Sequence, residues 1–253
     1  MFKNTNPVFS KVRRDTSDQA ISYGASYQGV ILKTGLLFLL IVASAFGSYF
    51  LLAKASFEVY IAGLVISSIV AFISVFIASL SPRLAMPFSI LYALAEGFLL
   101  GFIVLVYTYA FPNDNIAGLA ILITLGIFAG MLVLYSTKLI VVTSRFRRVM
   151  LGVTFAILFS FLFVGIASLF DGGRLSYTLF GNPNSGLVLF IALLLVLYGA
   201  FMLVMSFDDA RNIVSMGADK KYEWVVSLGL VVSTIYIFIQ VLRLLAILAS
   251  RKD

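Results

Sequence analysis

Seven long apolar runs constrain this chain more than any other feature of its sequence. Each run is long enough, at 1.5 Å per helical residue, to cross a bilayer's hydrocarbon core of about 30 Å. Runs that stay apolar for about twenty residues favour helices over the strands of a membrane barrel, in which apolar and polar residues alternate. We therefore predict an all-α, polytopic membrane protein with seven transmembrane helices. The predicted spans are Ile31–Ala53, Tyr60–Leu80, Leu84–Phe111, Ile116–Ser136, Val149–Phe170, Gly186–Phe207 and Trp224–Leu248.

The composition supports this class and restricts the chemistry that the chain can perform. Hydrophobic residues make up 62% of the chain and charged residues 11%, whereas soluble domains have about 45–50% and about 25%. The sequence has no cysteine and no histidine, which excludes disulfides and metal or catalytic sites built from these residues. A bound metal would be a hard cation such as calcium, held by oxygen. Enzyme motifs for phosphate binding or hydrolysis are missing, so we do not expect an enzyme.

The predicted domain organisation is a polar N-terminal arm followed by one transmembrane domain. We expect residues 1–30 to form a partly ordered cytoplasmic arm, or a short amphipathic helix on the membrane surface, and residues 31–250 to form the membrane domain. With the N-terminus inside the cell, 13 of the 18 lysines and arginines lie on the cytoplasmic side and four outside. This bias predicts a cytoplasmic N-terminus and an external C-terminus. A six-span alternative, with a re-entrant last segment, would return the C-terminus to the cytoplasm.

Two adjacent acids at the end of the sixth span are the least ordinary residues of the chain. Asp208 and Asp209 follow about twenty apolar residues, and a carboxylate near the membrane core costs about 2.5–3.5 kcal/mol. One interpretation is a solvated helix end, where Arg211 forms a local ion pair with Asp208. The other is a cytoplasmic gate, in which Arg83 from the second span clamps an Asp until protonation or a cation releases it. The two aspartates are also the candidate calcium ligands.

Glu96 is the acid closest to the middle of any predicted span. One interpretation is a carboxylate that relays a cation or a proton, and the other is a protonated side chain hydrogen bonded to a neighbouring helix. Gly97 and Gly101 follow it at a spacing of four residues, which allows two helices to pack closely at this level.

Three further features carry charge close to the ends of the spans. Arg243 lies in the last span, where it either extends to the outer interface or pairs with a buried acid such as Glu96. Glu223 and Trp224 stand at the start of the last span. There the helix dipole stabilises an acid, and a tryptophan anchors the helix at the membrane interface. Glu223 is also a candidate pH sensor. The loop 143–148 is strongly basic, and anionic lipid headgroups suffice as its partner.

Several motifs, in this order and spacing, resemble the Bax inhibitor-1 (TMBIM) family, and most closely its bacterial YccA-like branch. The resemblance covers almost the whole chain and is most specific in the last forty residues. The motifs are Asn6-Pro7-Val8-Phe9, Ala95-Glu96-Gly97-Phe98-Leu99-Leu100-Gly101, Phe146-Arg147-Arg148, Phe207-Asp208-Asp209, Tyr222-Glu223-Trp224 and Leu242-Arg243-Leu244-Leu245.

The resemblance implies seven helices with the last one surrounded by the others, and a pH-sensitive calcium leak. In bacterial calcium-leak members, an Asp at the end of the sixth span faces an Asp in the seventh, and an Arg from the second span latches the former. Asp208 would be the sixth-span Asp and Arg83 the latch. The seventh-span position falls near Ser233 or Thr234, which are not acidic. Asp209, Glu223 or Glu96 would then have to replace the missing acid, which the sequence does not decide.

Two alternatives to a calcium leak stay open, the first of them implied by the resemblance. The YccA-like branch resembles modulators of membrane-bound AAA proteases, so the chain could be a regulatory binding protein that presents its N-terminal arm to such a protease. A third hypothesis is a proton-coupled transporter that uses Glu96. In each case we expect a multi-pass protein of the bacterial plasma membrane, with no cofactor.

Overall fold

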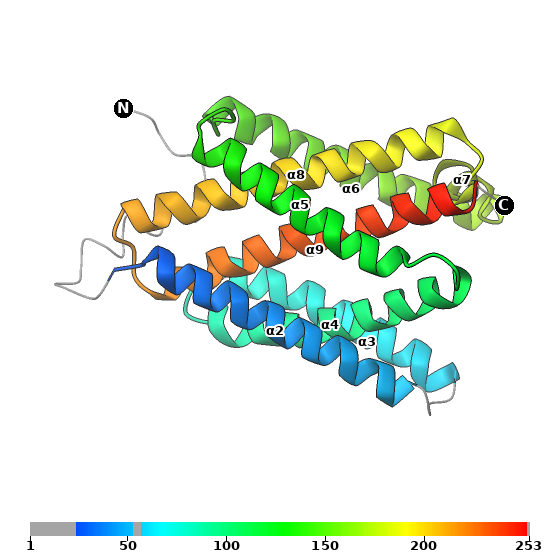
Figure 1. Ribbon diagram of the computed structural model, residues 1–253, viewed down its shortest axis with the longest axis horizontal. Helices are drawn as coiled ribbons and strands as arrows, with labels where there is room; N and C mark the ends of the chain where they lie inside the picture. The colour runs from blue at the N-terminus through cyan, green and yellow to red at the C-terminus, as the bar shows by residue number, and fades with distance from the viewer. Residues whose placement is uncertain (1–23, 53–56, 252–253) are drawn as a thin grey trace. The chain divides into compact units, whose positions relative to one another are not determined.

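The computed structural model describes residues 24–52 and 57–251, and all of its long elements are helices. The predicted arm, residues 1–30, therefore lies mostly outside the described residues. The elements, in chain order, are α2 (Tyr27–Leu52), α3 (Phe57–Leu80), α4 (Ala85–Ala110), α5 (Ile116–Ser136), α6 (Ser144–Asp171), α7 (Arg174–Ser176), the π-helical turn η1 (Tyr177–Gly181), α8 (Gly186–Ser215) and α9 (Lys221–Ala249) (Figure 1).

The seven long helices confirm the predicted all-α class. Helices α2 to α6, α8 and α9 are each long and apolar enough to cross a membrane. Two helices extend well beyond the predicted spans. Helix α6 begins at Ser144, because the Thr143 side chain accepts a hydrogen bond from the Phe146 N–H and caps the helix. The prediction of a basic loop over 143–148 was therefore wrong, because all of this segment except the capping residue Thr143 forms the first turns of α6. Helix α8 continues past the apolar run to Ser215.

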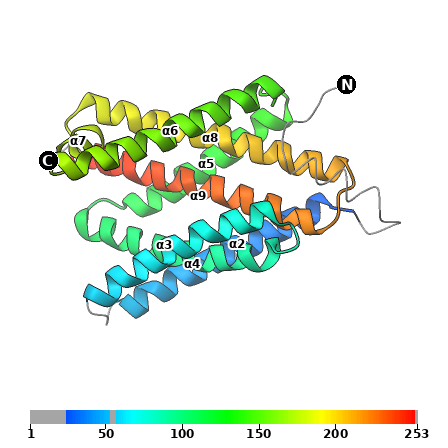
Figure 2. The same cartoon turned by 180° about the vertical axis from the view of Figure 1, so that it is seen from behind.

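The first of two compact units comprises residues 1–110 and 206–232. In it, α2 and α3 both pack against α4, and the three helices run side by side (Figures 1 and 2). A β-carbon at Gly97 would overlap the Ile41 carbonyl oxygen, and one at Gly101 would overlap the Ala45 carbonyl oxygen, both on α2. The Ser44 hydroxyl donates to the Leu94 carbonyl at 2.6 Å across the same contact. The predicted close packing at these glycines is thus confirmed.

The second unit comprises residues 111–205 and 233–253. Helix α6 packs against α8, where the hydroxyls of Thr154 and Tyr198 are 2.8 Å apart and the Phe146 and Phe201 rings meet edge to face at 5.8 Å. Helix α8 packs against the second half of α9 through an apolar cluster. Its buried members are Val188, Ala192 and Ile247, with Leu189 and Leu244 packed against them.

The last helix takes part in both units, since Lys221–Val232 belongs to the first and Ser233–Ala249 to the second. It contacts many of the other elements and is the most buried of the long helices. In its most apolar stretch, 61% of the residues are buried, against 6% in α6. Polar residues at its N-terminal end are buried together with the start of α2, and they form the site described next.

Candidate functional site

The turn between α8 and α9 is formed by residues that stop one helix and start the next. Gly217 follows α8 with a φ of 61°, a left-handed conformation that glycine adopts without strain. The Ala218 N–H then donates to the Ile213 carbonyl at 3.2 Å, which satisfies a carbonyl of the last turn. The Asp219 carboxylate accepts from the Lys221 N–H at 3.1 Å and caps α9. Glu223 is thereby placed in the first turn of α9, as predicted.

The segment before α2 is bound to this turn through its main chain. Gly24 and Asp219 form an antiparallel bridge, and the Ala25 N–H donates to the Ala218 carbonyl at 2.6 Å. Ser26 then caps α2, since its hydroxyl oxygen accepts from the Gly29 N–H at 3.0 Å. These contacts bring the N-terminus of α2 to the N-terminus of α9, although nearly 200 residues separate them in the chain.

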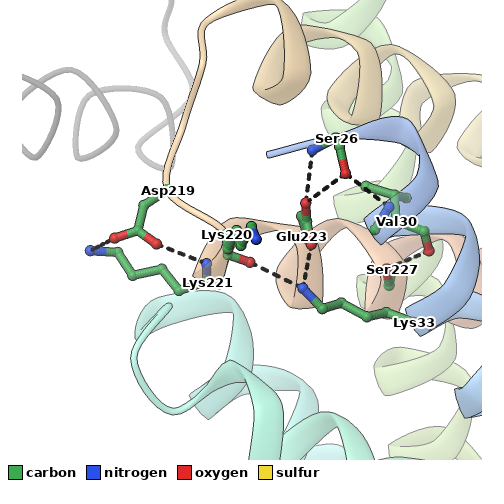
Figure 3. A network of polar contacts seen from close by, with 9 residues as sticks. Ser26, Val30, Lys33, Asp219, Lys220, Lys221, Glu223 and Ser227 are labelled. Atoms are coloured by element: carbon green, nitrogen blue, oxygen red, sulfur yellow. Dashed lines mark hydrogen bonds and ion pairs between the residues drawn. The ribbon is translucent and has the colours of Figure 1, made fainter. Parts of the chain in front are cut away.

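The carboxylate of Glu223 lies between these two helix ends (Figure 3). It accepts hydrogen bonds from the Ser26 N–H at 2.7 Å and the Ser26 hydroxyl at 3.3 Å, and it forms an ion pair with the Lys33 ammonium. Lys33 also donates to the Lys220 carbonyl at 3.3 Å. We call Ser26, Lys33, Lys220 and Glu223 the Lys33–Glu223 cluster.

The electrostatics of the cluster explain how a buried charge is tolerated. Glu223 is 2% exposed, and an isolated carboxylate so deeply buried would be very costly. Here the positive ends of two helix dipoles, two donors from Ser26 and the Lys33 ammonium all stabilise the negative charge. The Lys33 ammonium in turn lies 5.3 Å from the centre of the Trp224 ring, a favourable position for a cation.

The cluster is a close contact between α2 and α9. A β-carbon at Gly29 would overlap the Glu223 carboxylate, so only glycine leaves room for the carboxylate here. One turn along α9, the buried Ser227 hydroxyl donates to the Val30 carbonyl at 3.0 Å. Because the carboxylate and its ammonium partner are already bound to each other, the arrangement suits holding two helices together better than acid–base chemistry.

The predicted Asp208–Asp209 pair lies within α8, two turns before its end. Both side chains are half-buried, and the Asn212 side-chain amide donates to Asp208 at 3.0 Å. Arg211 is exposed. The pair is therefore held inside a continuous helix, with Asp208 bound by a residue one turn further along.

Arg83, the predicted latch, lies exposed in the turn between α3 and α4. In the described part of the chain, no ion pair joins it to Asp208. Glu96 is half-buried on α4, and no hydrogen bond or ion pair joins it to another described residue. Ser233 and Thr234, which occupy the expected position of the second aspartate, are 3% and 7% exposed.

Arg243 on α9 is bound by the segment that precedes α8. Its guanidinium donates to the Phe180 carbonyl at 3.1 Å and lies 5.1 Å from the centre of the Phe180 ring. Two turns further, Arg251 donates to the carbonyls of Pro183 and Ser185, each at 2.6 Å. The two arginines attach the C-terminal end of α9 to η1 and the following turn.

Within residues 24–52 and 57–251, no three acidic side chains gather closely enough to hold a metal ion. Asp208 and Asp209 supply two carboxylates, so the calcium site suggested for them stays a prediction.

Ser26, Lys33 and Lys220 are the residues of the cluster that the sequence analysis did not identify as site residues. Lys33 counted only toward the orientation of the chain. The available signal was a lysine three residues inside an apolar run, because such a charge requires a partner or access to water. Nothing in the sequence pointed to Glu223 as that partner.

The comparisons with known proteins agree with the motifs. A family model described as Bax inhibitor 1 like matches residues 6–250, which include all seven long helices. Neither the comparison with curated proteins nor that with solved structures found a match.

Proposed function

Because the chain belongs to the Bax inhibitor 1-like family, we propose that it is a calcium-leak protein whose opening responds to pH. Seven apolar helices make it a polytopic membrane protein. The observation that carries the proposal is the half-buried pair of carboxylates, Asp208 and Asp209, inside α8. Carboxylate oxygens are the ligands that calcium prefers, and acids at such positions line ion pathways in membrane proteins.

The proposed gate is an ion pair between Asp208 and Arg83. Asp208 is bound to Asn212, and Arg83 is exposed, so we assign this arrangement to the unlatched form. Closing the latch requires the Arg83 side chain to reach α8 and replace the amide as a donor to Asp208. A charged donor is the stronger one, so latching is favoured while Asp208 is ionised, and protonation of Asp208 releases it.

Glu96 is the proposed acid within the pathway. It is half-buried in α4 and no described residue neutralises it. The excess of basic residues in the loops on one side supports a cytoplasmic N-terminus, and with it a latch on the cytoplasmic side of the membrane, which we propose to be a bacterial plasma membrane.

Calcium flux into liposomes that contain the purified protein, followed from acidic to alkaline pH, tests the proposal. Arg83→Ala is expected to raise the leak at neutral pH, because the latch can no longer close. Asp208→Asn should remove the pH response, and Glu96→Gln should lower the flux at every pH. Asp114→Asn, an exposed acid in the α4–α5 turn, is the matched control. A pH response that Asp208→Asn and Arg83→Ala leave unchanged would refute the latch.

Absence of calcium flux in the wild-type protein would overturn the leak itself. The regulatory hypothesis would then take its place, with a membrane-bound AAA protease as the partner and the YccA-like branch as the relevant relatives. Removal of residues 1–23 would abolish protease regulation under that hypothesis, whereas it would spare a leak.

A further inference from the structure

The connection between α5 and α6 exposes basic and apolar side chains side by side in the chain. Lys138, Arg145 and Arg148 are all exposed, and no ion pair joins them to another described residue. The chain has no acid between Asp114 and Asp171. The positive charge of this connection is therefore not balanced by its neighbours in the sequence.

The basic residues lie at the end of α6 where a positive charge is least favourable. Arg145 and Arg148 belong to the first turns of the helix, which has no acidic residue there. Cations are destabilised by the positive end of a helix dipole, and like charges three residues apart face each other. An anion bound beside them would relieve both repulsions.

Exposed aliphatic residues accompany these charges. Leu139 and Val141 lie between the helices, outside any helical span, and are 74% and 60% exposed, while Val149 follows Arg148 on α6. A segment with aliphatic side chains beside basic ones suits the membrane interface, where the former enter the acyl region and the latter meet phosphates. Free phosphate would make no use of the aliphatic residues.

The backbone at Lys138 provides an independent sign that its side chain matters. Lys138 has a φ of 60° just after the end of α5, the only non-glycine residue with a positive φ among the described residues. Glycine usually occupies this position, because a side chain there is strained. Lysine therefore costs stability at a place where it adds a charge to the exposed basic surface.

Packing keeps the start of α6 in a fixed place. The Phe146 ring meets the Phe201 ring of α8 edge to face, and Thr143 caps the helix. Arg145 and Arg148 are thus presented from a capped and packed helix end, and such pre-organisation lowers the entropy lost when a ligand binds.

We propose that Lys138, Arg145 and Arg148, together with Leu139 and Val141, form a docking surface for anionic phospholipid headgroups. The surface shares no residue with the acids of the proposed leak, and the proposal does not depend on calcium conduction.

Native mass spectrometry of the full-length protein, titrated in detergent with phosphatidylglycerol or phosphatidylcholine, tests the surface. The wild type should retain phosphatidylglycerol preferentially, and millimolar inorganic phosphate should not displace it. Each of Arg145→Gln and Arg148→Gln should weaken retention of phosphatidylglycerol about fivefold, since each basic residue near an anionic membrane surface raises the binding affinity about fivefold. Arg174→Gln, at an exposed arginine on α7, should have no effect.

Lys138→Gly separates binding from folding. The substitution removes the charge and relieves the backbone strain, so the variant should be thermally more stable than the wild type and yet retain about fivefold less phosphatidylglycerol. Equal retention of the two lipids by the wild type, competition by inorganic phosphate, or unchanged retention in the three variants would each overturn the proposal.

Discussion

Replacing Lys33 with methionine should destabilise the protein more than the same replacement at any other lysine that the structure describes. Methionine keeps most of the volume and the apolar stem, and removes only the ammonium. The Glu223 side chain, 3% exposed, would then keep its negative charge with only the two Ser26 donors and the helix ends to stabilise it. Removing one partner of a buried ion pair costs about 3–5 kcal/mol.

Substitution of the other partner, Glu223, should destabilise the protein less, because the two side chains are not equally buried. Glu223→Gln leaves Lys33 without its carboxylate, but the lysine side chain is 20% exposed and its flexible stem can carry the ammonium to water. The glutamine still accepts hydrogen bonds from Ser26. We expect a loss of about 1–3 kcal/mol. The double variant Lys33→Met/Glu223→Gln should be more stable than Lys33→Met alone, because no uncompensated charge stays buried.

Reversible unfolding in mixed detergent micelles measures these differences, and hydrogen exchange of the Ala25 and Ser26 amides reports on the contact itself. Lys221→Met is the matched control. Its ion pair with Asp219, at 3.4 Å, joins side chains that are 24% and 33% exposed, and such pairs contribute about 0–1 kcal/mol. If Lys33→Met cost no more than Lys221→Met, the electrostatic account of the cluster would be wrong.

Two glycine predictions follow from close packing. Gly29→Ala should destabilise the protein and increase exchange of the Ser26 amide, because the new methyl group displaces the Glu223 carboxylate; Gly35→Ala, on the same helix with no atom within 4 Å, should not. Gly97→Ala should cost about 1–3 kcal/mol in the same unfolding assay, since its methyl group meets the backbone of α2 and the helices must separate. Gly126→Ala on α5, also with open space around it, is the control, and equal effects of the two would contradict this packing.

The sequence predicted the helices well because the bilayer imposes a length on each apolar run. Hydropathy locates the part of a helix that meets lipid, however, and not the helix itself. Helix α8 continues from Phe207 to Ser215 through charged residues, since charge ends a span but does not end a helix. The observed stop is Gly217, whose left-handed conformation the hydropathy pattern does not encode.

The candidate site was predicted only in part, because its residues are joined by contacts between segments far apart in the sequence. Glu223 could be identified as an acid at the start of a helix, because helix dipoles act within one turn. Its ion pair with Lys33 joins residues 190 positions apart, and local patterns carry no information about such a partner. The same reason limits what the sequence can say about the latch. Arg83 and Asp208 are each recognisable as charges at the ends of spans, but their pairing stays a prediction.

The position of the Lys33–Glu223 cluster gives the proposed gate a fixed support. The cluster and the bridge between Gly24 and Asp219 bind the α8–α9 turn to the start of α2. Asp208 lies on the helix that enters this turn. Packed elements switch between discrete arrangements and do not deform continuously. A gate therefore needs one element that moves and another that stays fixed. With the turn anchored at Asp219 and Glu223, we expect the exposed Arg83 side chain to be the part of the gate that moves and Asp208 the part that stays in place.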